Sequence, residues 1–380
     1  QVRVRTAAGP SATCIRLFLL GSTEGITMNK EQRPVTEAEL KEKVSLVNGG
    51  GQLNPDAVGW ARRSLVDTSG IDGAFGVAGL GGRGWLRNKR WEYWNVITPT
   101  HIIAMTVSSI DYAAVNEIWV FDRNTGKEIG KAVTSLPSHS ELPPNLGAGT
   151  AQARTQGLLL SIDMDGDKTR LRGVLSEGHH EEVAFDMRVV RPKGHDLLAV
   201  VVPWNQNRFQ YTVKDIALPV TGWVRVEGER FDVPEGSWAV LDHGRGRWPY
   251  DVKWNWGAGS GISNGHTIGL QVGGQWTDGS GVTENGMIID GRLYKISEYL
   301  KWDYDAEDDV KPWHVTGGGL DATLQPFYVK RSETNLGILA GKTAQAFGYW
   351  SGTFTDPGLE GGKISFEGLT GWAEDVHNRW

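Results

Sequence analysis

The stretch LDHGRGRWPYDVKWNW, Leu241–Trp256, mixes bulky aromatic side chains with ionisable ones. Tryptophan is mostly buried in proteins, and buried charge is costly unless it is paired. A cavity wall meets both conditions, because aromatic rings hold an apolar ligand while a few polar groups act on it. The tryptophans are Trp248, Trp254 and Trp256, and the ionisable residues are Asp242, His243, Arg245, Arg247, Tyr250, Asp251 and Lys253.

The sequence on both sides of this stretch is typical of short β-strands. Segments rich in β-branched and aromatic residues recur at regular spacing, separated by turn signals such as DGD and EGHH. This pattern predicts an antiparallel barrel or sandwich. No alternation of strands with helices indicates a parallel sheet. We therefore predict an all-β chain with an N-terminal extension over residues 1–60 and β domains over residues 61–235 and 236–380.

Helix signals are confined to the N-terminal part. Thr36 and Glu39 form a capping box, which predicts a helix over Thr36–Val47. A further helical turn is predicted within Asn54–Arg63, with Asn54 as the cap and Pro55 at the first position. We interpret Met28 as a natural start, so that residues 1–27 contribute little to the fold.

Composition narrows the classes of function. The 380 residues carry a formal net charge of −6, which argues against a nucleic-acid or anionic-membrane partner. No apolar run is long enough to span a bilayer. The single cysteine, Cys14, excludes an intramolecular disulfide and a thiolate zinc site. A reducing compartment fits this cysteine usage, so we expect a cytoplasmic location.

Three local motifs have simple structural interpretations. GLGGRG, Gly79–Gly84, has the spacing of a dinucleotide loop but is followed by a strand pattern, so we interpret it as a glycine-rich loop. DMDGDK, Asp163–Lys168, lacks the glutamate that ends a calcium loop, which favours a hairpin turn. HHEE, His179–Glu182, lies at a strand start and is interpreted as a solvated turn. We therefore expect no metal site.

Asp242 and His243 are the central candidates for chemistry. Neighbours in a regular strand point to opposite faces, but the glycines of HGRG allow a bulge that redirects side chains. In a dry pocket, either group would have a shifted pKa and could exchange protons. The structural alternative is an ion pair between Asp242 and Arg245 or Arg247 that ties the two halves together. The residues alone leave both interpretations open.

The stretch EGSWAVLDHGRG, Glu235–Gly246, resembles the G-x-x-W-x-D-H-E motif of the carotenoid hydratase (hydroxyneurosporene synthase) superfamily, to which Diels–Alderase-type cyclases are related. A closer likeness, over about residues 43–380, is to an uncharacterised bacterial family. Its motifs appear here as LNPDAVGWARRSL, KRWEYW, DHGRGRWPYDVKWNW and GWAEDVHNRW, at residues 53–65, 89–94, 242–256 and 371–380. The resemblance implies two consecutive lipocalin-like β-barrels. With the helix signals above, we predict two antiparallel lipocalin-like β-barrels with a short helical N-terminal lead.

The resemblance also implies an aromatic cavity that acts on, or holds, an apolar or aromatic small molecule without a metal or organic cofactor. Gly244 stands where the superfamily motif has an acid, which argues against hydration of a carotenoid. We predict a lyase, hydratase, isomerase or cyclase that works by acid–base chemistry. The predicted catalytic residues are Asp242, His243, Arg245, Arg247, Tyr250 and Lys253. The predicted substrate-binding residues are Trp238, Trp248, Trp254, Asn255, Trp256, Glu92, Tyr93 and Trp94.

Two alternatives remain at this stage. A lipocalin-like carrier binds by the same cavity physics and needs no proton-transfer groups. A glycan-active protein could use tryptophan platforms, but it would need two acids facing each other across a cleft. The sequence fixes no such pair, and it leaves the substrate and the oligomeric state open.

Overall fold

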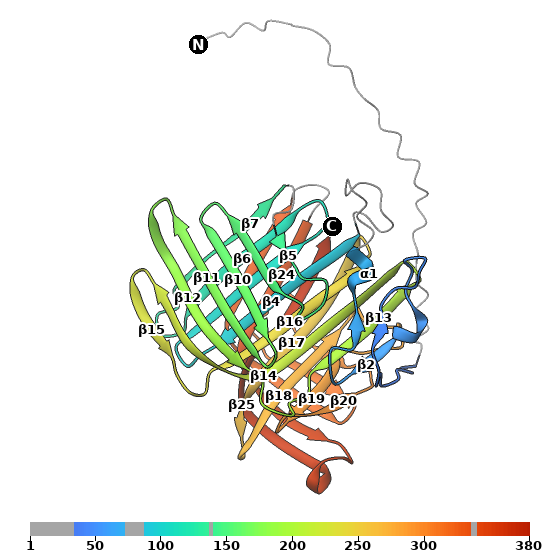
Figure 1. Cartoon of the computed structure of the whole chain (residues 1–380). Helices are drawn as coiled ribbons and strands as arrows, with labels where there is room; N and C mark the ends of the chain where they lie inside the picture. The colour runs from blue at the N-terminus through green and yellow to red at the C-terminus, as the bar shows by residue number, and fades with distance from the viewer. Residues whose placement is uncertain (1–33, 73–86, 137–139, 336–339) are drawn as a thin grey trace, which may run out of the picture. The chain divides into compact units, whose positions relative to one another are not determined.

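The computed structural model describes residues 34–72, 87–136, 140–335 and 340–380 (Figure 1). Met28 with the residues before it, and the glycine-rich segment Gly79–Gly84, lie outside the described residues. Two antiparallel sheets make up most of the described chain. No helix in this part is both long and apolar enough to cross a membrane.

The larger sheet has 14 strands within the described ranges. Three strands lie off its main path: β13 (Leu198–Asn205) and β15 (Glu229–Val233) pair with β14, and β2 (Gly59–Ala61) pairs with β13. The main path runs, in spatial order, through β7 (Glu128–Ser135), β6 (Ala114–Asp122), β5 (His101–Ser109), β4 (Asn88–Ile97), β16 (Trp238–Arg247), β14 (Arg208–Val226), β12 (His180–Val190), β11 (Lys168–Glu177), β10 (Leu158–Asp165), β9 (Thr150–Thr155) and β8 (Ser140–Glu141).

The smaller sheet contains nine strands of the described chain. In spatial order these are β20 (Arg292–Ile296), β19 (Asn285–Ile289), β18 (His266–Gly274), β17 (Asp251–Ser263), β25 (Lys363–Arg379), β24 (Ala340–Thr355), β23 (Leu320–Asn335), β22 (Trp313–Gly317) and β21 (Lys301–Asp303). The remaining described elements are short: β1 (Val44–Ser45) pairs with β3 (Val66–Asp67), and the helical turns are η1 (Pro55–Ala57), α1 (Ser69–Asp72) and η2 (Glu360–Gly362).

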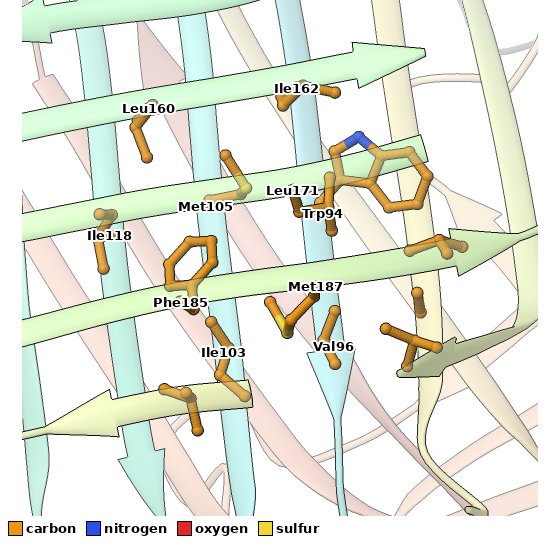
Figure 2. Packing of buried hydrophobic residues seen from close by; sticks show 14 of the residues in the cluster. Trp94, Val96, Ile103, Met105, Ile118, Leu160, Ile162, Leu171, Phe185 and Met187 are labelled. Carbon is orange, nitrogen blue, oxygen red and sulfur yellow. The ribbon is translucent and has the colours of Figure 1, made fainter. Parts of the chain in front are cut away.

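Each sheet curls around a core of its own. Figure 2 shows the core of the larger sheet, where Ile103, Met105 and Ile118 of β5 and β6 lie among Leu160 and Phe185 of β10 and β12. A separate core lies within the smaller sheet. A third cluster joins the two sheets and includes Trp119, Trp256, Phe347 and Trp372. The predicted all-β class is confirmed, with two large antiparallel sheets in the described residues.

The predicted helix over Thr36–Val47 is wrong. This segment is extended, because tertiary partners take up the backbone donors that a helix would use internally. The Leu40 amide donates to the Trp60 carbonyl at 2.7 Å, and the Val44 amide donates to the Leu65 carbonyl at 3.1 Å. The second helix signal is correct but short, since Asn54 caps only the three-residue turn η1.

Two of the local motifs have the predicted structures. DMDGDK forms the tight turn between β10 and β11, with Asp165 opposite Lys168 and Gly166 in the left-handed region. His179 and His180 are exposed at the start of β12.

The division of the chain near residue 235 remains a proposal. The strand that follows this position, β16, is hydrogen-bonded between β4 and β14 of the larger sheet. The chain enters the smaller sheet only at Asp251, where β17 begins. Strand β16, which follows the predicted division, therefore belongs to the larger sheet.

Candidate functional site

Strand β16 carries the centre of the candidate site on one of its two faces. Its register with β4 is regular from Trp238 to Arg247, so alternate residues point to opposite faces. The expectation that a bulge at HGRG redirects the side chains is wrong. Asp242 lies on the face toward the smaller sheet, and His243 lies on the other face.

The two glycines of this strand serve close packing instead. A Cβ atom at Gly244 would lie 2.2 Å from the ring of Trp91, and one at Gly246 would lie 2.1 Å from Oε1 of Gln210. Real Cβ atoms do not approach other atoms this closely, so glycine is required for the Trp91 ring and the Gln210 amide to lie against β16.

A cavity of about 450 Å³ lies between the two sheets. One wall is formed by side chains of β4, β5, β6, β7, β14 and β16, and the other by β17, β23, β24 and β25. Aromatic contacts also join the two sheets: the ring centroids of Trp119 and Phe347 are 5.5 Å apart, and those of Phe121 and Tyr328 are 3.9 Å apart.

Three carboxyl groups and one ammonium group meet on the cavity wall, and we call them the carboxyl–lysine cluster: Asp242, Glu284, Glu374 and Lys214. Nζ of Lys214 lies 3.1 Å from Oδ2 of Asp242 and 3.4 Å from Oε2 of Glu284. The same atom lies 3.8 Å from the centre of the Trp256 ring, a cation–π contact. Burial alone would lower the pKa of Lys214, but the Asp242 and Glu284 carboxyls together raise it above its ordinary value. Lys214 is therefore a fixed positive charge at neutral pH.

Glu374 is the third carboxyl of this cluster. It faces the cavity from β25, directly opposite Trp256, and its Oε1 accepts a hydrogen bond of 2.9 Å from Nε1 of Trp254. Burial, reinforced by the nearby Asp242 and Glu284 carboxyls, raises the pKa of Glu374 to about 7. Burial also raises the pKa of Glu284, whose Oε1 accepts a hydrogen bond from Nε1 of Trp276. Glu374 can therefore hold a proton near neutral pH.

Six tryptophans gather around this cluster and line the cavity: Trp91, Trp248, Trp254, Trp256, Trp276 and Trp380. The ring centroids of Trp248 and Trp276 are 5.6 Å apart in a stacked arrangement, and those of Trp248 and Trp254 are 5.9 Å apart edge to face. Such aromatic pairs stabilise one another and form a rigid apolar surface.

His243 belongs to a buried network on the other side of β16. Its Nδ1 lies 2.9 Å from Oε1 of Glu92, and the Arg245 guanidinium donates to the same oxygen at 3.1 Å. Burial and the neighbouring Arg245 lower the pKa of His243, so the imidazole is neutral at pH 7. Burial opposes ionisation of Glu92, but its contacts with His243 and Arg245 outweigh this and lower the pKa of Glu92. None of the three lines the cavity.

The structure places the other predicted residues in three groups. On the cavity wall are Tyr93, Trp248, Trp254 and Trp256. Buried but away from the cavity are Trp94 in the core of the larger sheet, Arg247 bonded to Asn88, and Asn255 bonded to Tyr304. Outside the lining are the exposed Tyr250 and Lys253 and the half-buried Trp238.

The sequence interpretation missed Lys214, Glu284 and Glu374. Each is an ionisable residue within or beside an apolar strand segment, as in RFQYTVK, VTENGMII and GWAE. An ionisable residue in such a segment is a signal for a buried site, because charge is rarely buried without a partner. Strand pairing within each sheet, together with the facing of the two sheets, brings the three together with Asp242, from positions up to 160 residues apart along the chain (374 against 214).

No group of three or more His, Cys, Asp or Glu residues in the described part of the chain is arranged to hold a metal ion.

Comparison with solved structures gives related folds at low sequence identity. A proposed AttH from Nitrosomonas europaea has a TM-score of 0.46 at 14% identity, over 78% of this chain and 94% of that one. Kievitone hydratase from Nectria haematococca has a TM-score of 0.45 at 12% identity, over 77% and 89%. CghA with Sch210972 has a TM-score of 0.43 at 11% identity, over 80% and 92%.

No curated protein matches the chain. A family model does match, over residues 37–380, and this range includes every residue of the carboxyl–lysine cluster. The predicted membership of an uncharacterised family is confirmed. The chain belongs to the family described as domain of unknown function DUF2804.

Proposed function

We propose that this protein is a lyase, hydratase, isomerase or cyclase that transfers protons to and from an apolar or aromatic small molecule in the cavity between its sheets. The observation that carries the proposal is the cluster of Asp242, Glu284 and Glu374 around Lys214. Two of these carboxyl groups, Glu284 and Glu374, have raised pKa values, and perturbed carboxyl groups in a cavity mark candidate sites of acid–base chemistry. A cavity of about 450 Å³ suits a small molecule.

Two carboxyl groups in different surroundings provide both halves of a proton transfer. Glu374, with a pKa of about 7, is the proposed proton donor. Asp242, held by Lys214 and by a hydrogen bond of 2.8 Å from the Thr212 hydroxyl, is the proposed acceptor. Donation of a proton to one substrate atom and removal of a proton from another gives an isomerisation. If water attacks the protonated substrate instead, the same groups give a hydration.

The tryptophans support this chemistry by excluding water. In a site of low dielectric constant, a fixed ammonium such as Lys214 stabilises developing negative charge more strongly than it would in water. The same apolar walls favour substrates with planar or hydrocarbon surfaces. This proposal replaces the expected proton transfer by His243 with proton transfer by carboxyl groups.

Proton transfer can be tested before the substrate is known. The wild-type protein is incubated with an extract of small molecules in deuterated water, and the extract is analysed by mass spectrometry. We expect at least one compound to gain deuterium, through exchange, isomerisation or addition of solvent. Glu374→Gln keeps the hydrogen-bond acceptor for Trp254 but cannot donate an acidic proton, so the labelled compound should not form.

Glu367→Gln is the matched control, because Glu367 lies on the same strand and is exposed. It should label the compound at the wild-type rate. If Glu374→Gln also labels at that rate, Glu374 is not the donor. If the wild-type protein retains compounds on filtration but labels none, the protein is a carrier and the catalytic proposal is wrong.

A further inference from the structure

The register of the two sheets divides the cavity into levels. Residues directly opposite one another in an antiparallel sheet share a face. One level contains Lys214, Asp242 and Tyr93 in the larger sheet. The facing level of the smaller sheet contains Trp256, Glu374, Gln345 and Lys330. We call these residues together the polar floor.

Contacts between the sheets show that these two levels face each other. Nε2 of Gln345 lies 3.4 Å from the hydroxyl of Tyr93, and Nζ of Lys330 lies 2.7 Å from Oε1 of Glu117 on β6. The polar floor therefore crosses the cavity from the carboxyl–lysine cluster at one end to the Lys330–Glu117 ion pair at the other.

The two ends of the cavity differ in chemistry. The end beside β16 and β17 carries the six tryptophans. The opposite end, which we call the hydroxyl end, is formed by β5, β7, β23 and β24 and carries six hydroxyl side chains: Thr106, Ser108, Thr134, Ser332, Thr334 and Thr343. Ser332 and Thr343 are direct cross-strand neighbours.

The hydroxyl end has capacity for hydrogen bonds with a ligand. The Ser108 hydroxyl donates to the carbonyl of Val115. Within the described residues, the other five hydroxyls make no hydrogen bond to protein. The Lys330–Glu117 pair, partly exposed at the floor of this end, adds a donor and an acceptor. Neutral hydroxyls with one charged donor and one charged acceptor suit the hydroxyl groups of a ligand, which donate and accept at once.

On this basis we propose that the substrate has two parts: an aromatic ring system held by the tryptophans, and a polyhydroxylated substituent, such as a glycosyl group, bound at the hydroxyl end. This inference rests on the proposed function in one respect: the ring system is taken as the part of the substrate that reacts, because it lies beside Asp242 and Glu374. The substituent acts as a handle that sets the position of the ring along the cavity.

A matched pair of probes tests this assignment by binding alone. The ligands are 4-methylumbelliferone and its β-glucoside, which share the ring system and differ in the sugar. We expect calorimetry on the wild-type protein to show tighter binding of the glucoside, by about fivefold for each hydrogen bond gained. The double variant Ser332→Ala/Thr343→Val should lose most of this preference and leave the affinity for the aglycone unchanged.

The control is Thr323→Val/Ser351→Ala, a cross-strand pair of the same type on the same two strands and outside the cavity lining. It should keep the wild-type preference. Four results would each overturn the assignment. In the wild-type protein these are equal affinity for the two ligands, tighter binding of the aglycone, or no binding of the glucoside. The fourth is an unchanged preference in Ser332→Ala/Thr343→Val. Binding does not depend on turnover, so this result is separate from failure of the proton-transfer proposal.

Discussion

At the scale of single residues, the protonation of Glu374 links the site to stability. Its pKa is about 7 in the folded protein, against an ordinary value of 4.5 for a glutamic acid side chain. The folded state thus binds the proton more tightly, and the free energy of unfolding should fall as the pH rises from about 4.5 to about 7, then level off. The difference of about 2.5 units corresponds to roughly 3 kcal/mol. Denaturant titrations across this pH range should show a smaller fall for Glu374→Gln.

Asp242 and His243 are adjacent in sequence but predicted to act differently. Asp242→Asn removes the proposed proton acceptor from the cavity, so labelling from deuterated water should be lost. His243→Gln disturbs only the buried network with Glu92 and Arg245. It should lower the free energy of unfolding by about 1–3 kcal/mol and leave the labelling rate within a few-fold of wild type. Loss of labelling in a folded His243→Gln protein would contradict the placement of His243 outside the site.

Gly244 tests the packing of Trp91 against β16. The added Cβ of Gly244→Ala meets the indole ring, so the ring must move toward the cavity, and the strain should cost about 1–3 kcal/mol. Ligand binding should weaken as well. Gly49→Ala is the control, because a Cβ there meets no atom within 4 Å and the backbone is not in the left-handed region. Equal stability and binding of the two variants would argue against this packing.

At the scale of elements, the alternation of β16 explains which site residues the sequence could reveal. Side chains along a strand alternate between its two faces. Asp242 therefore lies on one face with Gly244 and Gly246, and His243, Arg245 and Arg247 lie on the other. The motif therefore identified the strand correctly. It could not show which face meets the cavity, because that depends on β4, β14 and the smaller sheet. Lys214 joins the site through strand pairing in the larger sheet, and Glu284 and Glu374 join it because the smaller sheet faces the larger one.

The N-terminal segment shows a different limit of sequence interpretation. Its capping box is a sound helix signal, but Glu37 instead forms a buried ion pair of 2.5 Å with Lys295, with side-chain exposures of 0% and 4%. Long-range contacts of this kind override local propensity.

Disrupting this pair should show how the segment is held. Glu37→Gln or Lys295→Met alone leaves one buried group without its partner and should cost about 3–5 kcal/mol. The double variant should recover much of that loss, because no charge remains unpaired. A double-mutant cycle by chemical denaturation measures the coupling, and a coupling near zero would contradict a buried pair.

At the scale of the whole described chain, the strand pattern was sufficient to predict an all-β fold with two sheets. It did not locate the change from one sheet to the other, since β16 closes the gap between β4 and β14 after the predicted division. The cavity takes its walls from both sheets, so its chemistry follows from the way the sheets meet. Neither sheet alone holds both Asp242 and Glu374.

The central claim is that this cavity keeps a carboxylic acid protonated near neutral pH. Infrared spectroscopy detects the carbonyl stretch of a protonated carboxyl group directly, and the difference between wild type and Glu374→Gln isolates one residue. We expect a carbonyl band that is present in the wild-type protein below pH 7, disappears with a midpoint near pH 7, and is absent from Glu374→Gln. If this band has already disappeared by pH 5 in the wild-type protein, the cavity does not keep Glu374 protonated and the central claim is wrong.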